Sequence, residues 1–285
     1  MSAHALGEPP RNNLKTKRST LNEPERKRWA APMKIYLINL DRDASRLAHM
    51  RDQLNGVAFE RISAVDGSSL PPTTRGLTRF ELACLESHRI AWRHFLSGPE
   101  ACACIVEDDL HIWPGFAALT ERASWIPPDA HSIKLDTYLQ KVELGEKQVA
   151  VGKRQIARLY SRHQSSAAYV VTREGAARYL GLTATASLPA DYALFPNHPR
   201  RLGLRIYQLT PAIAIQDHLL EPNQGGKAFA TAMAAADGSP PPRRASTIEK
   251  LGREGVRLAS QAAGLVERTY QKAVLGLETT TVGVG

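Results

Sequence analysis

Hydrophobic and polar positions follow two periods along residues 34–220, one typical of strands and one typical of helices. Apolar runs of strand length occupy residues 34–40, 59–65, 101–106, 132–135, 167–171, 205–209 and 212–215. The run at 101–106 is continuously apolar, which predicts a central strand buried on both faces. Between several of these runs, apolar residues recur at steps of three and four. This order predicts an α/β fold, with helices on both faces of a sheet.

Capping residues mark where the helices should begin. Thr78 and Glu81 have the spacing of a capping box, in which both side chains satisfy free N–H groups at the start of a helix. We expect this helix to run to about Phe95. Three further helix starts are marked by Asp43, Pro114 and Thr172. Residues 141–160 are less regular and are expected to form a hairpin or a flap.

The pattern divides the chain into four parts. Residues 1–32 are polar, basic and without periodicity, which predicts a disordered and dispensable segment. The folded domain is expected at 33–221, and Met33 is a candidate for the true start because the first strand follows it directly. Residues 222–245 are rich in Gly, Pro and Ala, as in a linker. Residues 246–285 are expected to be a helical tail.

One stripe of a helix is apparent in that tail. Its positions are Ile248, Leu251, Gly255, Leu258, Ala262 and Leu265. Lys250, Arg253 and Arg257 lie off the stripe, so this would be a basic amphipathic helix that can lie in a membrane interface. The alternatives are a helix that packs on the domain and one that pairs with another subunit.

Charge is concentrated at the ends of the chain. The net charge is +9, of which residues 1–32 contribute +4 and residues 221–285 contribute +2. These tails lack interleaved aromatic residues and the core has no nucleic-acid motif, so we expect no nucleic-acid partner.

Three cysteines, Cys84, Cys102 and Cys104, are too few and too unevenly placed for a disulfide framework, which fits a reducing compartment. The sequence has no apolar run of membrane-spanning length and no secretory signal. We therefore expect a cytoplasmic protein, with peripheral contact at the inner membrane as a further expectation.

The sharpest chemical feature is the acidic triplet Glu107-Asp108-Asp109, directly after the most apolar strand. Ligands of open α/β sheets bind at the carboxyl ends of strands. Adjacent carboxylates repel each other unless a cation neutralises them, and their oxygens suit Mg²⁺ or Mn²⁺. Such an ion can bridge a protein to a diphosphate. The alternative is a solvated acidic turn at a strand end.

A second group shares one face of the capped helix, since its members differ by three or four positions. The members are Glu81, Cys84, Leu85, His88 and Trp92. From spacing alone, a single histidine on such a face is more often a core residue than a ligand.

Several of these segments, taken in order, resemble glycosyltransferase family 25, the lipopolysaccharide and lipooligosaccharide sugar transferases related to collagen galactosyltransferases. The matching segments are Leu37-Ile38-Asn39-Leu40-Asp41-Arg42 with Arg46, Ala64-Val65-Asp66-Gly67, Glu81 to His88 with Trp92, Val106-Glu107-Asp108-Asp109, Ala167 to Thr172 with Ala176-Ala177, and Leu188-Pro189-Ala190-Asp191-Tyr192. Each motif is weak alone, but their common order is a strong signal over residues 34–220.

The resemblance implies a GT-A-like nucleotide-sugar-binding fold, a UDP-sugar donor that is often UDP-galactose, a glycan or lipid-linked acceptor, a divalent cation and inversion at the anomeric carbon. Carried over residue by residue, Glu107 and Asp109 would be metal ligands. Donor-binding residues would be Asn39, Arg42, Arg46, Asp66, His88 and Asp108. Arg46 could pair with phosphate or form a structural ion pair.

Inversion by direct displacement needs a general base for the acceptor hydroxyl. Asp191, in the family's Pro-x-Asp position, is the first candidate for a catalytic residue, with acceptor binding or helix capping as alternative roles. Asp136 and Glu86 are lesser candidates for the base. Asp217-His218 follows a late strand and is a further candidate for a metal ligand.

Two departures from the family pattern put the choice of sugar and acceptor in doubt. Ala83 stands where many members have Gly, and Ala190-Asp191-Tyr192 replaces the commoner Val-Asp-Trp. The alternative function is a catalytically inactive GT-A-like binding or scaffold protein. The intact acidic triplet counts against that alternative.

Overall fold

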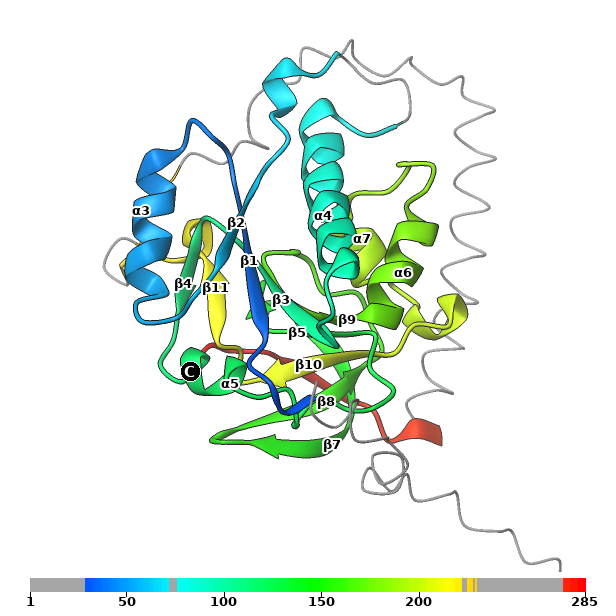
Figure 1. Cartoon of the computed structure of the whole chain (residues 1–285). Helices are drawn as coiled ribbons and strands as arrows, with labels where there is room; N and C mark the ends of the chain where they lie inside the picture. Colours follow the sequence, from blue (N-terminus) through cyan, green and yellow to red (C-terminus); the bar gives the residue numbers. More distant parts are fainter. Residues whose placement is uncertain (1–28, 72–75, 222–224, 228, 230–273) are drawn as a thin grey trace, which may run out of the picture.

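The computed structural model describes residues 29–71, 76–221, 225–227, 229 and 274–285, and nine strands of that part form one mixed sheet (Figure 1). Its order is β12-β7-β8-β10-β5-β9-β3-β1-β2. The strands are β1 (Lys34–Asn39), β2 (Glu60–Ser63), β3 (Cys102–Glu107), β5 (Ser132–Lys134), β7 (Lys141–Val151), β8 (Arg154–Leu159), β9 (Ala168–Thr172), β10 (Ile206–Thr210) and β12 (Glu278–Thr281). Strands β1, β2 and β3 are parallel, so their carboxyl ends meet at one edge.

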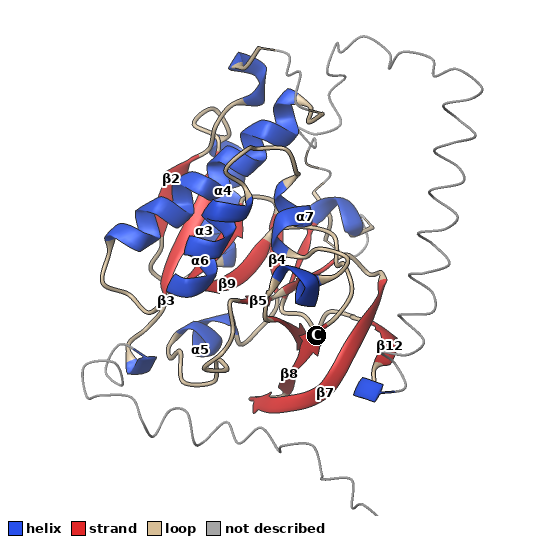
Figure 2. Cartoon of the chain, turned by 90° about the vertical axis from the view of Figure 1, so that its right-hand side faces the viewer, coloured by secondary structure: helices blue, strands red, loops and turns tan. Residues whose placement is uncertain are grey.

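Helices cover both faces of this sheet, which confirms the predicted α/β class. On one face lie α3 (Ala44–Gln53) and α5 (Phe116–Thr120), and on the other α4 (Arg79–Ser97), α6 (Arg173–Leu182) and α7 (Ala190–Leu194) (Figures 1 and 2). Alternate side chains of β1 divide between the two cores, since Ile35 and Leu37 pack with α3, whereas Tyr36 and Ile38 pack with α4 and α6.

Strand β3 is buried along its length up to Glu107, as its continuous apolar run predicted. Antiparallel β9 lies beside it and separates it from β5. Residues 141–160 form the expected hairpin of β7 and β8. A second, three-stranded sheet, in the order β4-β11-β6, lies where β3 ends. Its strands are β4 (Leu110–Ile112), β6 (Asp136–Thr137) and β11 (Ala214–Gln216).

The capping predictions are confirmed at two helices and differ at two others. Thr78 and Glu81 make both capping-box hydrogen bonds, and Thr172 Oγ1 accepts a hydrogen bond from Gly175 N. The Asp43 side chain makes no capping bond. The helix expected at Pro114 begins at Phe116, because Gly115 takes a left-handed conformation with φ 101°.

The two ends of the chain differ from the expected boundaries. Trp29 packs against the core beside Met33, so the segment before Met33 contributes contacts to the domain. At the other end, β12 pairs with β7 and Val282 is buried, so the last residues of the expected helical tail are a strand of the main sheet. The predicted helix at 248–265 lies outside the described residues, as does almost all of the predicted linker.

Three short 3-10 helices complete the part of the chain that the structure describes, namely η1 (Gly67–Ser69), η2 (Pro199–Leu202) and η3 (Asp217–Leu219). A helix that is both long and apolar enough to cross a membrane does not occur in this part.

Candidate functional site

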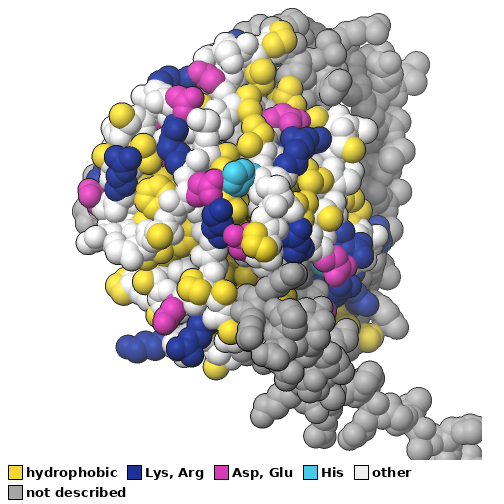
Figure 3. Space-filling view, in the orientation of Figure 1, with side chains coloured by type: hydrophobic (Ala, Val, Ile, Leu, Met, Phe, Trp, Pro, Cys, Tyr) yellow, Lys and Arg dark blue, Asp and Glu magenta, His cyan; other side chains and the backbone are white. Residues whose placement is uncertain are grey.

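A pocket of about 670 Å³ opens at the carboxyl ends of β1, β2 and β3. The nine residues predicted as catalytic, donor-binding or metal-binding all line it, namely Asn39, Arg42, Arg46, Asp66, His88, Glu107, Asp108, Asp109 and Asp191. Seven of them lie at or after the ends of the parallel strands β1, β2 and β3, which share one edge of the sheet, whereas His88 comes from α4 and Asp191 from α7. On the face of the molecule in Figure 3, acidic and basic side chains are interspersed with hydrophobic ones.

The three carboxylates of the acidic triplet point to different neighbours. Glu107 contacts α4 and the loop before β9, Asp108 contacts β1 and α3, and Asp109 contacts β11. Among the described residues the three do not form one tight three-ligand group. The triplet therefore offers separate carboxylates around the pocket.

Asp108 is held by two donors. Asn39 Nδ2 donates to its Oδ2 at 2.7 Å, and Arg46 Nη1 donates to Oδ1 at 2.8 Å. Burial raises the pKa of Asp108, although Arg46 opposes the rise. Arg61 Nε donates to Asn39 Oδ1 at 2.8 Å, which turns the Asn39 amide group toward Asp108. Of the two roles considered for Arg46, the structural ion pair is present, and phosphate binding stays a prediction.

Glu107 is held from two sides through one oxygen. His88 Nε2 lies 3.1 Å from Glu107 Oε1, and Ser166 Oγ donates to the same oxygen at 2.8 Å. Burial would raise the pKa of Glu107, but these two hydrogen bonds, together with charge interactions with His88 and Lys134, outweigh burial and lower it. Both ring nitrogens of His88 are engaged by the protein, since Nδ1 lies 2.9 Å from the Tyr169 hydroxyl. His88 therefore acts on the pocket through Glu107.

Asp109 lies near the charges of the other two carboxylates of the triplet. Burial and the charge of Glu107 raise its pKa to about 7, although Arg46 opposes the rise. Its carboxylate accepts only long bonds from Gln216 Nε2, at 3.3 Å to each oxygen, among the contacts of the described residues. A hard divalent cation would relieve the repulsion between these buried carboxylates.

Cys84, His88 and Glu107 place one possible metal-ligating atom each within 4.8 Å of one another. Burial raises the pKa of the Cys84 thiol well above its ordinary value, with a smaller contribution from Glu107. A thiol is also a soft ligand, whereas Mg²⁺ and Mn²⁺ prefer oxygen ligands, so Cys84 is the least suited of the three to such an ion.

Asp66 closes another side of the pocket. Its Oδ1 accepts hydrogen bonds from Ser68 N at 2.8 Å and Ser68 Oγ at 2.7 Å, and its Oδ2 forms an ion pair with Arg42. Gly67 allows this turn to approach α4, because a Cβ there would lie 2.5 Å from Phe80 Cδ1.

Asp191 is in the first turn of α7, on the pocket wall. Its Oδ2 accepts a hydrogen bond from Arg162 Nη2 at 2.9 Å. The Arg162 guanidinium also lies 3.4 Å from the centre of the Tyr192 ring. Arg162 thus fixes both the carboxylate and the aromatic side chain that follows it.

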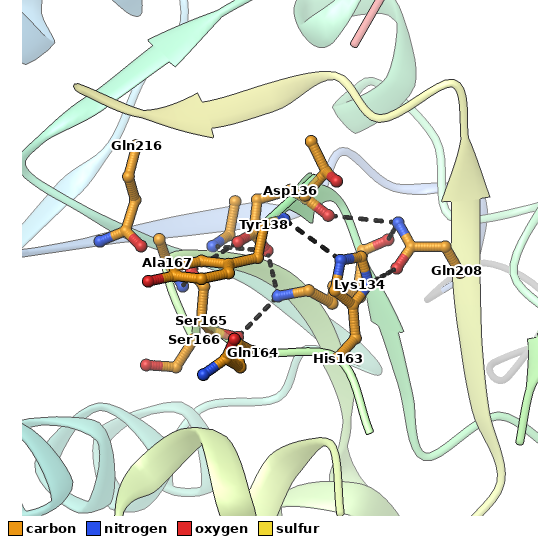
Figure 4. Close-up of polar contacts among 12 residues, drawn as sticks. Lys134, Asp136, Tyr138, His163, Gln164, Ser165, Ser166, Ala167, Gln208 and Gln216 are labelled. Carbon is orange, nitrogen blue, oxygen red and sulfur yellow. Dashed lines mark hydrogen bonds and ion pairs between the residues drawn. The ribbon is translucent and has the colours of Figure 1, made fainter. Parts of the chain in front are cut away.

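The two lesser candidates for the base do not line this pocket. Asp136 is fully buried, and Lys134 Nζ donates to its Oδ1 at 2.8 Å (Figure 4). Ser165 Oγ donates to Asp136 Oδ2 at 2.6 Å, so Asp136 anchors the loop that carries Ser166. Glu86 forms an ion pair with Arg89 on the same helix. The suggestion that either one could act as the base is not supported by their positions.

Asp217 and His218 are neighbours in the sequence, but only His218 lines the pocket. Asp217 is buried, and its carboxylate binds His111 Nε2 at 2.7 Å and Phe229 N at 2.8 Å. Those contacts stabilise the fold and leave it outside the pocket. His218 lines the pocket, with its ring 5.9 Å from that of Tyr138.

Sequence reasoning missed the residues that orient the site. They are Arg61, Arg162, Ser166, Tyr169 and Gln216. Only Tyr169 lies in a segment that resembles the family, and each of the five meets its partner only through the fold. Arg162 carried the clearest signal, since it belongs to the basic stretch before β9.

A protein-family model described as "Glycosyltransferase family 25 (LPS biosynthesis protein)" matches residues 33–194. The lacto-N-neotetraose biosynthesis glycosyltransferase LgtB of Neisseria meningitidis serogroup A is 26% identical over 211 residues, which are 65% of this chain and 75% of that protein. The lipooligosaccharide biosynthesis protein lex-1 of Haemophilus influenzae is 29% identical over 164 residues, 53% of each chain.

A solved glycosyltransferase involved in glycosylation of the major capsid of PBCV-1 covers 71% of this chain and 95% of its own, with 10% identity and a TM-score of 0.38. A likeness at that level carries no argument. The family match includes all the candidate site residues from Asn39 to Asp191.

Proposed function

This chain belongs to glycosyltransferase family 25. From that premise we propose that it transfers a hexose from a UDP-sugar to the glycan of a lipooligosaccharide or lipopolysaccharide. Galactose is the first candidate for the hexose. The family match confirms the resemblance seen in the motifs. Two relatives are named for lacto-N-neotetraose and lipooligosaccharide biosynthesis, which supports this acceptor class. We also propose a GT-A-like arrangement of the sheet.

The observation that carries the proposal is the pocket at the carboxyl ends of β1, β2 and β3. It combines acidic groups that suit a cation with arginines that suit phosphate, and a separate carboxylate on α7. Its volume of about 670 Å³ lies within the range of small-molecule and cofactor sites.

We assign the donor to the side of the pocket formed by β1, α3 and the turn after β2. Asp66 would contact the ribose or base, and Arg42 beside it would face the diphosphate. Arg46 and Asp108 neutralise each other, so with Asn39 they form a polar wall of fixed geometry. Such a wall orients the donor without adding net charge.

Glu107 and Asp109 would hold the divalent cation, Mn²⁺ or Mg²⁺. The raised pKa of Asp109 supports this assignment, because burial and the charge of Glu107 outweigh the opposing charge of Arg46. When bound, the ion would supply charge neutralisation at the diphosphate leaving group.

Asp191 would be the general base. The acceptor hydroxyl oxygen forms a bond to the anomeric carbon as the bond from that carbon to the diphosphate oxygen breaks. The hydroxyl proton passes to the Asp191 carboxylate, and attack opposite the leaving group inverts the anomeric configuration. Arg162 holds one oxygen of Asp191 and thereby sets its direction.

A lipid-linked acceptor places the reaction at a membrane surface. We propose a cytoplasmic enzyme that meets its acceptor at the inner membrane, with residues 246–273 as the segment that would contact lipid. That segment lies outside the described residues, and its membrane contact remains a prediction.

The function is tested by offering purified protein a panel of UDP-sugars with Mn²⁺ and a lipooligosaccharide acceptor, and measuring UDP release and labelled product. We expect one UDP-hexose to be consumed faster than the others, with acceptor-dependent product. UDP release with none of the donors would contradict the proposal.

A further inference from the structure

A chain of hydrogen bonds runs behind Glu107 through three buried aromatic side chains. Trp92 Nε1 donates to the Tyr169 hydroxyl at 2.8 Å, and His88 Nδ1 lies 2.9 Å from the same oxygen. His88 Nε2 then lies 3.1 Å from Glu107 Oε1. Trp92, Tyr169 and His88 are each at most 1% exposed. We call these four residues the Glu107 relay.

The groups at the two ends of the Glu107 relay determine which atom donates and which accepts in each hydrogen bond. An indole N–H can only donate, so the Tyr169 oxygen accepts from Trp92. The hydroxyl hydrogen of Tyr169 is then available to His88 Nδ1. At the other end, an ionised Glu107 can only accept, so His88 Nε2 must carry a hydrogen. A His88 ring with its hydrogen on Nε2 and none on Nδ1 satisfies both ends, because the buried Tyr169 hydroxyl then has an acceptor for its own hydrogen.

Packing alone does not account for the Glu107 relay. Trp92 and Tyr169 belong to the apolar cluster under α4 and α6, where polar atoms are costly unless every one is bonded. Among the described residues, both donors to Glu107 converge on Oε1, which leaves Oε2 for a ligand. The arrangement holds one carboxylate rigidly at the edge of the pocket.

We propose that Tyr169 and Trp92 are positioning residues for the transfer reaction, which they serve by fixing the orientation of the His88 ring and, through it, that of the Glu107 carboxylate. The effect on the cation rests on the proposed function. Groups that orient the ligands of a metal commonly change its affinity by about 10–100-fold when they are removed.

The variant Tyr169→Phe removes one oxygen from the Glu107 relay and keeps the ring. Tyr179→Phe is a matched control. Tyr179 is equally buried in the same apolar cluster, and its hydroxyl bonds to Ser132 Oγ at 2.7 Å, away from His88. Both variants lose one buried hydroxyl, so a purely structural role predicts similar losses of melting temperature and no difference in ligand binding.

Two measurements distinguish the proposed positioning role from a purely structural one. The first is ¹⁵N NMR of the His88 ring in the metal-free protein, assigned by comparison with His88→Gln. The second is calorimetric titration with UDP in Mn²⁺. We expect the Nδ1 resonance of His88 to shift in Tyr169→Phe and to keep its wild-type position in Tyr179→Phe, whereas Nε2 keeps its hydrogen in all three proteins because Glu107 remains its acceptor. We also expect UDP affinity in Mn²⁺ to fall about tenfold in Tyr169→Phe alone.

An Nδ1 resonance of His88 that responds equally to the two tyrosine variants would overturn the proposal, as would equal UDP affinity in those variants. If wild type binds no UDP in Mn²⁺, the proposed function fails. The positioning proposal then fails for the cation, while the NMR result still decides whether the Tyr169 hydroxyl holds the His88 ring.

Discussion

At the scale of single residues, each candidate site residue is held by a neighbour distant in the sequence. Arg61 orients Asn39, Ser166 and His88 hold Glu107, and Arg162 holds Asp191. Side chains fixed in this way are preorganised, so little further ordering is needed when a ligand binds. The pocket is therefore built before any donor arrives.

If Asp191 is the base, replacing it should slow the chemical step and leave donor binding unchanged. Asp191→Asn keeps the shape of the side chain and removes its basicity, so turnover should fall by about 10²–10⁴-fold while UDP affinity is retained. Steady-state kinetics and UDP titration measure the two quantities.

Asp129→Asn is the matched control, because Asp129 is also paired with arginines but does not line the pocket. It should retain its turnover. Near-normal turnover in Asp191→Asn would show that the base is another group.

A buried histidine predicts acid sensitivity. His163 is fully buried, its Nδ1 lies 2.7 Å from Gln208 Oε1, and Tyr138 N donates to its Nε2 at 3.1 Å (Figure 4). Burial lowers the pKa of His163 from 6.5 to about 3. The unfolded chain therefore binds a proton below pH 6.5 that the folded chain does not, and stability falls as the pH falls.

We expect the free energy of unfolding to drop by about 2 kcal/mol between about pH 6.5 and about pH 5 from this group. Urea unfolding across that range measures the drop. His163→Gln should be less stable at neutral pH and should have a flatter pH profile. Parallel profiles for the two proteins would show that His163 is not the titrating group.

Residue roles were predictable where a motif follows a strand. The acidic triplet, Asn39 and Asp66 could be placed together from the sequence, because parallel strands bring their carboxyl ends to one edge. Arg61 and Tyr169 could not, since their roles depend on contacts between segments far apart in the chain. The relevant signal is three-dimensional distance, which spacing does not encode.

At the scale of elements, the apolar strands and the capped helices could be read from the pattern. The buried run of β3 and the capping box of α4 are local signals. Strand β12 was not predicted, because its sequence Glu-Thr-Thr-Thr has no hydrophobic alternation. β12 is held in the sheet by its pairing with β7 and by the burial of Val282, the residue after the strand.

Strand β12 leads to a prediction of stability. Val282 is 2% exposed within the core, whereas Val274 is 60% exposed. Val282→Ala should cost about 2 kcal/mol by opening a cavity, and Val274→Ala should change stability little. Urea denaturation midpoints compare them. Equal midpoints for the two variants would mean that the C-terminal strand adds no stability to the sheet.

At the scale of the whole molecule, the function depends on the order of the strands. Antiparallel β9 lies between β3 and β5, so Ser166 just before β9 reaches Glu107 at the end of β3. That order could not be derived from periodicity, because alternating patterns set the class of a sheet and not the sequence of its neighbours. The family match over residues 33–194 spans this arrangement through α7.

The central claim is that this pocket transfers a sugar from a UDP-sugar with the help of its acidic residues. The most direct test follows labelled galactose from UDP-galactose into lipooligosaccharide, in Mn²⁺ and in EDTA. It compares wild type, Asp109→Ala and the exposed control Glu278→Ala. We expect transfer by wild type and Glu278→Ala in Mn²⁺, and a loss of about 100-fold or more in EDTA and in Asp109→Ala, which should remain folded. Full turnover in EDTA or in Asp109→Ala would contradict the account.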